Sequence, residues 1–225
     1  MFDIDGTLVL TGGAGARAMA RAFEEVFGVP NGLAGIAMAG RTDAWIVRQA
    51  AATHQVPCDA AWLARFREAY LARLAAEVHE PGPRKGIMPG VRSLLDALAG
   101  RDDAFLALLT GNFERGARVK LEYFDLWRYF SCGAYGDETL ERNALLSLAV
   151  ARVKASGGPA VRASEVVVVG DTPLDVAVAQ AGGARSVAVA TGGYDAATLA
   201  AAGADVVLDD FSDLNAALEA LGIEE

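Results

Sequence analysis

Short runs of β-branched and other apolar residues recur along the chain, with amphipathic stretches between them. The clearest run is four consecutive valines at 166–169, followed by Gly-Asp, and such a run is typical of a parallel strand buried on both faces. Similar runs predict further strands at 2–5, 104–109, 186–190 and 206–208. Helical periodicity fills intervals between them, at 91–98, 115–123, 142–153 and 174–181. The alternation predicts an α/β fold with a mostly parallel sheet covered by helices on both faces.

One long stretch, from about residue 13 to residue 86, breaks this alternation. It contains no convincing strand pattern, and its apolar residues recur at steps of three and four, as in amphipathic helices. Segments with Gly and Pro border it, at 11–13 on one side and at 80–83 on the other. We therefore predict two domains: an α/β domain of residues 1–12 and 87–225, and a smaller helical domain of residues 13–86 inserted on two hinges.

The composition narrows the class of protein. Of 225 residues, 53% are hydrophobic and 22% are charged, as in folded globular proteins. Twenty basic and 29 acidic residues give a net charge of −9, without a long basic run, which argues against nucleic acid or an anionic membrane surface as a partner. Two separated cysteines form neither a disulfide framework nor a metal motif.

The sequence also indicates where the protein resides. No apolar run approaches the roughly 18 residues of a membrane span, and two aspartates occur early, where a signal peptide would be apolar. We therefore expect a cytoplasmic protein.

Polar residues follow three of the predicted strands at their carboxyl ends, where ligands of open parallel sheets bind. They lie in the segments Asp-Ile-Asp-Gly-Thr at 3–7, Thr-Gly-Asn at 110–112 and Gly-Asp-Thr-Pro-Leu-Asp at 170–175. A single Asp after a strand is more often a helix cap or turn residue, but three such segments in this order favour a shared site. There, four carboxylates would repel one another unless a cation lay between them. Oxygen ligands with water and phosphate are typical of Mg²⁺, and the carboxylates belong to Asp3, Asp5, Asp171 and Asp175.

These segments resemble motifs of the haloacid dehalogenase-like hydrolases, which are mostly Mg²⁺-dependent phosphatases. Residues 3–7 resemble the first motif, Thr110 the second and residues 170–175 the fourth, and the resemblance extends over nearly the whole chain. The helical insertion is similar to the cap of the phosphoglycolate phosphatase and β-phosphoglucomutase group. The resemblance implies a Rossmann-like core with a small helical cap, and hydrolysis of a small phosphorylated metabolite through an aspartyl phosphate.

The resemblance also implies a role for each motif residue. Asp3 would be the nucleophile and a metal ligand, while Asp5 would be the general acid and base and would bind the metal through its backbone carbonyl. Asp171 would complete the Mg²⁺ site, with Asp175 in support. Thr110 would donate its hydroxyl to a phosphoryl oxygen, a role compatible with capping the next helix. The backbone N–H groups expected to hold phosphoryl oxygens are those around Asp5, Gly6, Gly111 and Asn112.

The chain departs from the family pattern in two places. The third motif is usually a Lys, and the best counterpart in this chain is Arg142 at a predicted helix start. Arginine keeps the charge and can bind two oxygens, but it is not interchangeable with lysine. Lys120 and Lys154 lie on amphipathic helices, and we expect them to be solvated surface charges. The first strand is also short, because only Met1 and Phe2 precede Asp3; either upstream residues are missing from this sequence or the strand is unusually short.

Residues of the predicted cap offer fewer signals. Arg41 precedes a predicted helix capped by Thr42, and in the resembling family the cap loop near this position faces the active site. A substrate contact and a plain surface charge both remain open for Arg41. His54 and His79 have no partners at metal-ligand spacing, and we expect them at the surface or in packing.

Three alternatives to a phosphatase share parts of this pattern. A dehalogenase would lack an acid two residues after the nucleophile, so Asp5 argues against it. A phosphosugar mutase keeps both carboxylates and stays open. A receiver-like signalling module also combines Asp, Thr and a cation on a parallel sheet, but it has no need for Asp5 or for a long insertion.

Overall fold

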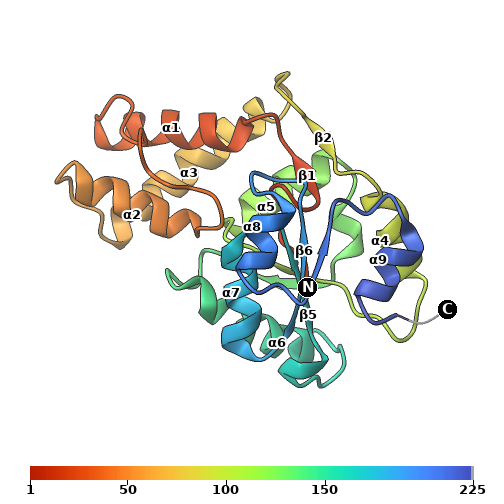
Figure 1. Ribbon diagram of the computed structural model, residues 1–225. Coiled ribbons are helices and arrows are strands. Elements are labelled where there is room, and N and C mark those ends of the chain that lie inside the picture. The colour runs from red at the N-terminus through yellow and green to blue at the C-terminus, as the bar shows by residue number, and fades with distance from the viewer. Residues whose placement is uncertain (224–225) are drawn as a thin grey trace.

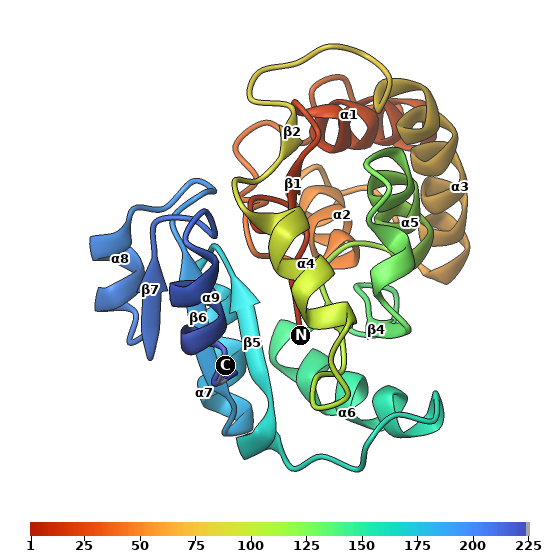
Figure 2. The same ribbon diagram turned by 90° about the vertical axis from the view of Figure 1, so that its right-hand side faces the viewer.

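The amino-terminal residues of the protein lie at the centre of a parallel sheet, in a computed structural model that describes residues 1–223 (Figures 1 and 2). Phe2 forms parallel bridges to Leu108 on one side and to Val169 on the other. The Phe2 N–H donates to the carbonyl of Ala107 at 3.0 Å, and the Asp3 N–H donates to that of Val169 at 2.9 Å. This segment therefore joins two groups of strands into one sheet, although it is shorter than the strand predicted at 2–5. From one edge to the other, the remaining strands are β4 (Cys132–Ala134), β3 (Ala107–Leu109), β5 (Val167–Gly170), β6 (Arg185–Val189) and β7 (Val206–Leu208).

Helices cover both faces of this sheet (Figure 1). Side chains of successive strand residues alternate between the faces: Leu108 packs in one hydrophobic cluster and Leu109 in another. One face packs against α4 (Val91–Ala99), α5 (Glu114–Tyr123) and α9 (Leu214–Ala220), and the other against α6 (Leu145–Ala155) and α7 (Pro173–Gly182). Helix α8 (Ala196–Ala201) covers β6 and β7 near the sheet edge, and 3₁₀ turns occur at η1 (Trp127–Tyr129), η2 (Arg142–Ala144) and η3 (Ala163–Glu165). The predicted α/β class is confirmed.

A second group of helices lies to one side of the sheet and has its own core. It comprises α1 (Ala14–Phe27), α2 (Asp43–Thr53) and α3 (Ala60–Glu77). Phe23, Phe66 and Ile46 are buried where these three helices meet. Two short antiparallel strands, β1 (Val9–Leu10) and β2 (Gly86–Ile87), pair where the chain enters and leaves this helical unit (Figure 2). The inserted helical cap is confirmed, whereas the domain boundaries at 13 and 86 stay a prediction.

Three strands were absent from the sequence prediction. Strand β4 has the sequence Cys-Gly-Ala, which lacks the β-branched residues that favour strands. Strands β1 and β2 contain two residues each, too few for any periodicity to show. Among residues 1–223, no helix has both the length and the apolar character of a membrane span.

Candidate active site

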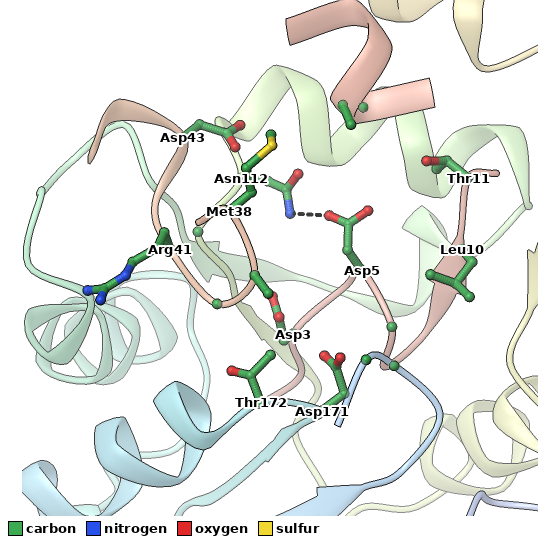
Figure 3. A pocket seen from close by; sticks show the side chains of 18 of the residues that line it. Asp3, Asp5, Leu10, Thr11, Met38, Arg41, Asp43, Asn112, Asp171 and Thr172 are labelled. Atoms are coloured by element: carbon green, nitrogen blue, oxygen red, sulfur yellow. Dashed lines mark hydrogen bonds between the residues drawn. The ribbon is translucent and has the colours of Figure 1, made fainter. Parts of the chain in front are cut away.

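A cavity of about 430 Å³ lies between the carboxyl ends of the sheet strands and the helical cap. Figure 3 shows Asp3, Asp5, Asp171 and Thr172 along its wall, below the loop that carries Met38 and Arg41. The three polar segments that follow the predicted strands thus meet at one edge of the sheet, because residues 1–3 lie between β3 and β5.

A buried cluster of three carboxylates and one guanidinium forms one side of the cavity. Asp3, Asp171 and Asp175 each place an oxygen within 4.8 Å of the others. Arg142 is buried among them; its Nη2 lies 3.1 Å from Asp3 Oδ2 and also forms an ion pair with Asp175. The structure thus brings Arg142 together with Asp3 and Asp175, and its contact with a phosphoryl group stays a prediction.

The charges of this cluster are not balanced by protein groups alone. Burial raises the pKa of Asp3 to about 6, although the Arg142 guanidinium lowers it. Burial also raises the pKa of Asp171 well above its ordinary value, and the negative charges of Asp175 and Asp3 raise it further. Three buried carboxylates therefore face one buried cation, and a second positive charge would stabilise their ionised forms.

The oxygen-only donor set of this cluster fits a hard divalent cation such as Mg²⁺. Thr7 Oγ1 donates to Asp171 Oδ1 at 3.1 Å and holds that carboxylate in place. Gly6 has a positive φ of 88°, and a Cβ at this position would lie 2.4 Å from Asp171 Oδ2. Asp175 accepts hydrogen bonds from both the backbone N–H and the hydroxyl of Thr172 at the start of α7. Asp175 is thus held by α7 and by Arg142, and its supporting role at the metal stays a prediction.

Asp5 points away from the three-carboxylate cluster and opens into the cavity, with a side chain that is 41% exposed. Asn112 Nδ2 donates to Asp5 Oδ2 at 2.9 Å, as the dashed line in Figure 3 marks. Lys120 Nζ donates to the same oxygen at 2.6 Å and to Asn112 Oδ1 at 2.6 Å. The Asp5 carboxylate is therefore fixed by an amide and an ammonium.

The predicted surface position of Lys120 is wrong, whereas Lys154 is exposed as predicted. Only 5% of the Lys120 side chain is exposed. The sequence does contain a sign that Lys120 is buried. Phe113, Ala117 and Leu121 are buried at steps of four along one face of α5, and Lys120 lies between the last two. A lysine on the buried face of an amphipathic helix needs an anionic partner, and in this structure Asp5 is that partner.

The segment after β3 lines the cavity with side chains and backbone. Asn112 Nδ2 donates to the buried Thr110 Oγ1 at 2.8 Å, and a hydrogen bond with Thr110 also favours the ionised form of Asp3 and lowers its pKa. The Gly6 N–H donates to the carbonyl of Val9, and the Asn112 N–H approaches Thr110 Oγ1 at 3.3 Å. Within residues 1–223, the N–H groups of Asp5 and Gly111 have no acceptor, so these two fit the predicted phosphoryl contacts best.

The loop before α2 connects the cap to this segment. Asp43 is buried, its N–H donates to the carbonyl of Gly111 at 2.7 Å, and its Oδ2 accepts from the Phe113 N–H at 2.9 Å. Burial raises the pKa of Asp43 to about 7, against the lowering effect of Lys120. Thr42 caps α2 as predicted, accepting from the Trp45 N–H.

Arg41 has its backbone at the cavity and its side chain outside it. A Cβ on Gly111 would lie 2.2 Å from the Arg41 carbonyl oxygen, so the loop packs directly on the segment after β3. The Arg41 guanidinium is centred 4.5 Å from the Trp45 ring and points away from Asp3 and Asp5 in Figure 3. The structure does not bring this guanidinium to the carboxylates, and its contact with a substrate stays a prediction.

Known proteins resemble this chain in sequence. The model of a family described as haloacid dehalogenase-like hydrolase matches residues 1–189. A phosphoglycolate phosphatase of Rhodospirillum rubrum is 36% identical over 149 residues, which are 65% of this chain and 59% of that protein. A phosphoglycolate phosphatase of Agrobacterium fabrum is 28% identical over 97% of this chain and 91% of its own length.

Solved structures share the fold. CbbY from Rhodobacter sphaeroides, crystallised in complex with phosphate, superposes with a TM-score of 0.68 at 22% identity, covering 95% of this chain and 94% of that one. At this identity the likeness shows a common fold and does not identify a substrate.

Proposed function

The chain belongs to the haloacid dehalogenase-like hydrolase family, and from that premise we propose that it is a Mg²⁺-dependent phosphatase of small phosphorylated metabolites. The two relatives described as phosphoglycolate phosphatases support this activity and a phosphoglycolate-like substrate. The observation that carries the proposal is the pair of carboxylates in the first polar segment. Asp3 is buried beside Arg142, while Asp5, two residues later, opens into the same cavity. A nucleophile and a proton donor can therefore face one bound ester from the same segment.

The proposed reaction has two steps. First, an Asp3 oxygen bonds to phosphorus as the bond between phosphorus and the ester oxygen breaks, and Asp5 gives its proton to the leaving oxygen. Then water attacks the phosphorus of the aspartyl phosphate, Asp5 takes the proton of that water, and the Asp3 carboxylate is released. The products are inorganic phosphate and an alcohol.

The residues around Asp3 stabilise the charge of the phosphoryl oxygens. We assign this role to the Arg142 guanidinium, the Thr110 hydroxyl and the N–H groups of the segment that contains Gly111. Arg142 Nε is buried and has no acceptor within residues 1–223, as expected of a donor whose acceptor belongs to a bound ligand.

The metal would be held by the carboxylates of Asp3 and Asp171 and by the backbone carbonyl of Asp5, with Asp175 in support. Bound Mg²⁺ supplies positive charge to the phosphoryl oxygens. Without a cation, an incoming phosphate ester would meet the uncompensated negative charge that raises the pKa of Asp171.

The cap closes the other side of the cavity. Helices α1 and α2 supply the apolar side chains of Met19 and Ile46 to its wall, and α3 supplies Tyr70. Excluding water from the cavity strengthens the electrostatic interactions on which the reaction depends. Because the groups near Asp3 are occupied with the phosphoryl group, we assign the recognition of the leaving group to the side of the cavity that faces the cap.

The direct test is phosphate release from a panel of phosphate monoesters that includes phosphoglycolate, sugar phosphates and nitrophenyl phosphate. We expect release with Mg²⁺, loss of activity in excess chelator, and poor activity with Ca²⁺, which prefers more ligands and longer bonds. Full activity in excess chelator would contradict the metal assignment. Transfer of the phosphoryl group to a second sugar hydroxyl, without release, would assign a mutase instead.

A further inference from the structure

The ammonium of Lys120 lies on the leaving-group side of the cavity and has a donor to spare. A lysine ammonium has three N–H donors. Two of them are used, by Asp5 Oδ2 and by Asn112 Oδ1, each at 2.6 Å. Lys120 itself lines the cavity. Within residues 1–223 the third donor has no hydrogen-bond acceptor.

The cap leaves the space beside this ammonium open. Gly15, in the first turn of α1, also lines the cavity, and a Cβ at this position would lie 3.2 Å from Lys120 Nζ and 3.9 Å from the Tyr70 hydroxyl. Gly116 on α5 similarly makes room for the Tyr70 ring, since a Cβ there would lie 3.1 Å from Tyr70 Cε1. The absence of a side chain at Gly15 thus leaves the ammonium accessible from the cavity.

The other cations that line the cavity are committed elsewhere. Arg142 pairs with Asp3 and Asp175 on the phosphoryl side. The Arg41 guanidinium stacks on Trp45 and points outward. Arg84 is exposed and donates to the carbonyl of Thr191. Among the described residues, Lys120 is therefore the buried cation next to Asp5.

The distances define the ligand that Lys120 can reach. Since one Asp5 oxygen must come within about 3 Å of the ester oxygen to protonate it, and Lys120 Nζ lies 2.6 Å from Asp5 Oδ2, the ammonium lies within about 8 Å of the ester oxygen whichever Asp5 oxygen carries the proton. An anionic group separated from the ester oxygen by one carbon falls in this interval. We propose that Lys120 binds a carboxylate on the leaving group through its third N–H, and that it thereby selects phosphate esters of short hydroxy acids.

This inference rests on the proposed function, in which Asp5 carries the proton for the leaving oxygen. Lys120 already pairs with Asp5, so a substrate carboxylate is the acceptor for the third N–H, which has no acceptor within residues 1–223. A buried N–H donor without an acceptor is costly. An ester of the same length without a carboxylate leaves this donor unpaired.

The test compares 2-phosphoglycolate with ethyl phosphate, which has the same chain length and no carboxylate. We expect the wild-type protein to prefer phosphoglycolate by at least about tenfold in kcat/KM, as for a charged hydrogen bond to a buried group. Lys120→Met, which keeps the length of the side chain and removes its charge, should abolish most of this preference. Lys154→Met removes an exposed lysine of α6 and should leave the preference intact.

Equal losses on both esters in Lys120→Met would mean that Lys120 only positions Asp5, and would overturn the inference. No preference in the wild-type protein would overturn it as well, without any variant. Binding of both esters to Asp3→Asn, measured by calorimetry with and without Lys120→Met, distinguishes failure of this inference from failure of the proposed function. A preference in binding that depends on Lys120, without turnover in the wild-type protein, would support the inference and contradict the phosphatase assignment.

Discussion

The two sides of the cavity are built from different parts of the fold. On the phosphoryl side, Asp3 and Asp171 directly follow strands, and both are buried with raised pKa values. On the leaving-group side, Asp5 is 41% exposed and is held by Lys120 from the last turn of α5. Strand ends fix the first group through the register of the sheet, whereas the second depends on a helix and on the cap. The difference suggests that the first side performs chemistry common to all substrates and that the second side chooses among them.

Asp3→Asn should produce the largest effect, because no other group replaces a covalent nucleophile. We expect turnover to fall by at least about 10⁴-fold on every ester, whatever its leaving group. Steady-state kinetics on alkyl and nitrophenyl phosphates would measure this, with a thermal melt as the control for folding. More than about a hundredth of wild-type turnover on either ester would remove the aspartyl phosphate from the reaction path.

Asp5→Asn tests the leaving-group side of the cavity separately from the phosphoryl side. Its proton transfer is worth about 10²–10⁴-fold, so turnover of alkyl phosphates should fall by that factor. Nitrophenolate leaves without a proton, so its formation in the first step should fall far less. The measurement is the ratio of the two losses in single-turnover experiments. Equal losses would show that Asp5 does not act on the leaving group.

Arg142 tests the charge balance of the phosphoryl side. Arg142→Met leaves buried carboxylates without their cation, and we expect about a 10²–10³-fold loss of kcat/KM and a loss of about 3–5 kcal/mol in the free energy of unfolding. Arg142→Lys should recover part of both. The control is Arg162→Met, which removes an exposed ion pair with Glu165 and should change neither quantity. If Arg142→Met changed neither quantity, Arg142 would not balance the charges of the phosphoryl side.

The sequence predicts the phosphoryl side better than the leaving-group side, and the reason is geometric. Asp3 and Asp171 adjoin strands whose apolar runs are evident, so their convergence follows from a parallel sheet. Lys120 reaches the site because α5 turns one particular face toward Asp5, and a helical pattern shows which residues share a face but not what that face meets. The contact between Asp43 and Phe113 joins residues 70 apart in the chain, and no periodicity encodes such a contact.

A smaller effect should appear in the pH dependence of the free energy of unfolding, through the buried carboxyl group of Asp43. Burial raises the pKa of Asp43 from 3.8 to about 7, so between these values the folded protein keeps a proton that the unfolded chain has released. The free energy of unfolding should therefore fall as pH rises from about 4 to about 7, and stay level above this range with respect to Asp43. Asp43→Asn should remove part of this fall, which urea unfolding at several pH values would measure.

The control for the pH experiment is Asp195, an exposed residue that caps α8. Hydrogen bonds from Thr198 lower its pKa, so it contributes in the opposite direction. Asp195→Asn should leave the fall between pH 4 and 7 in place. An unchanged fall in Asp43→Asn would show that Asp43 is ionised in the folded protein across this range.

The central claim is that Asp3 takes the phosphoryl group while Asp5 serves the leaving group and the water. Rapid-quench kinetics of Asp5→Asn with nitrophenyl phosphate test it most directly, because the first step needs no acid and the second lacks its base. We predict a burst of about one nitrophenolate per active site, followed by slow turnover, and a phosphoryl group on the peptide that contains Asp3. Linear release without a burst, or a phosphoryl group on any other residue, would contradict the account.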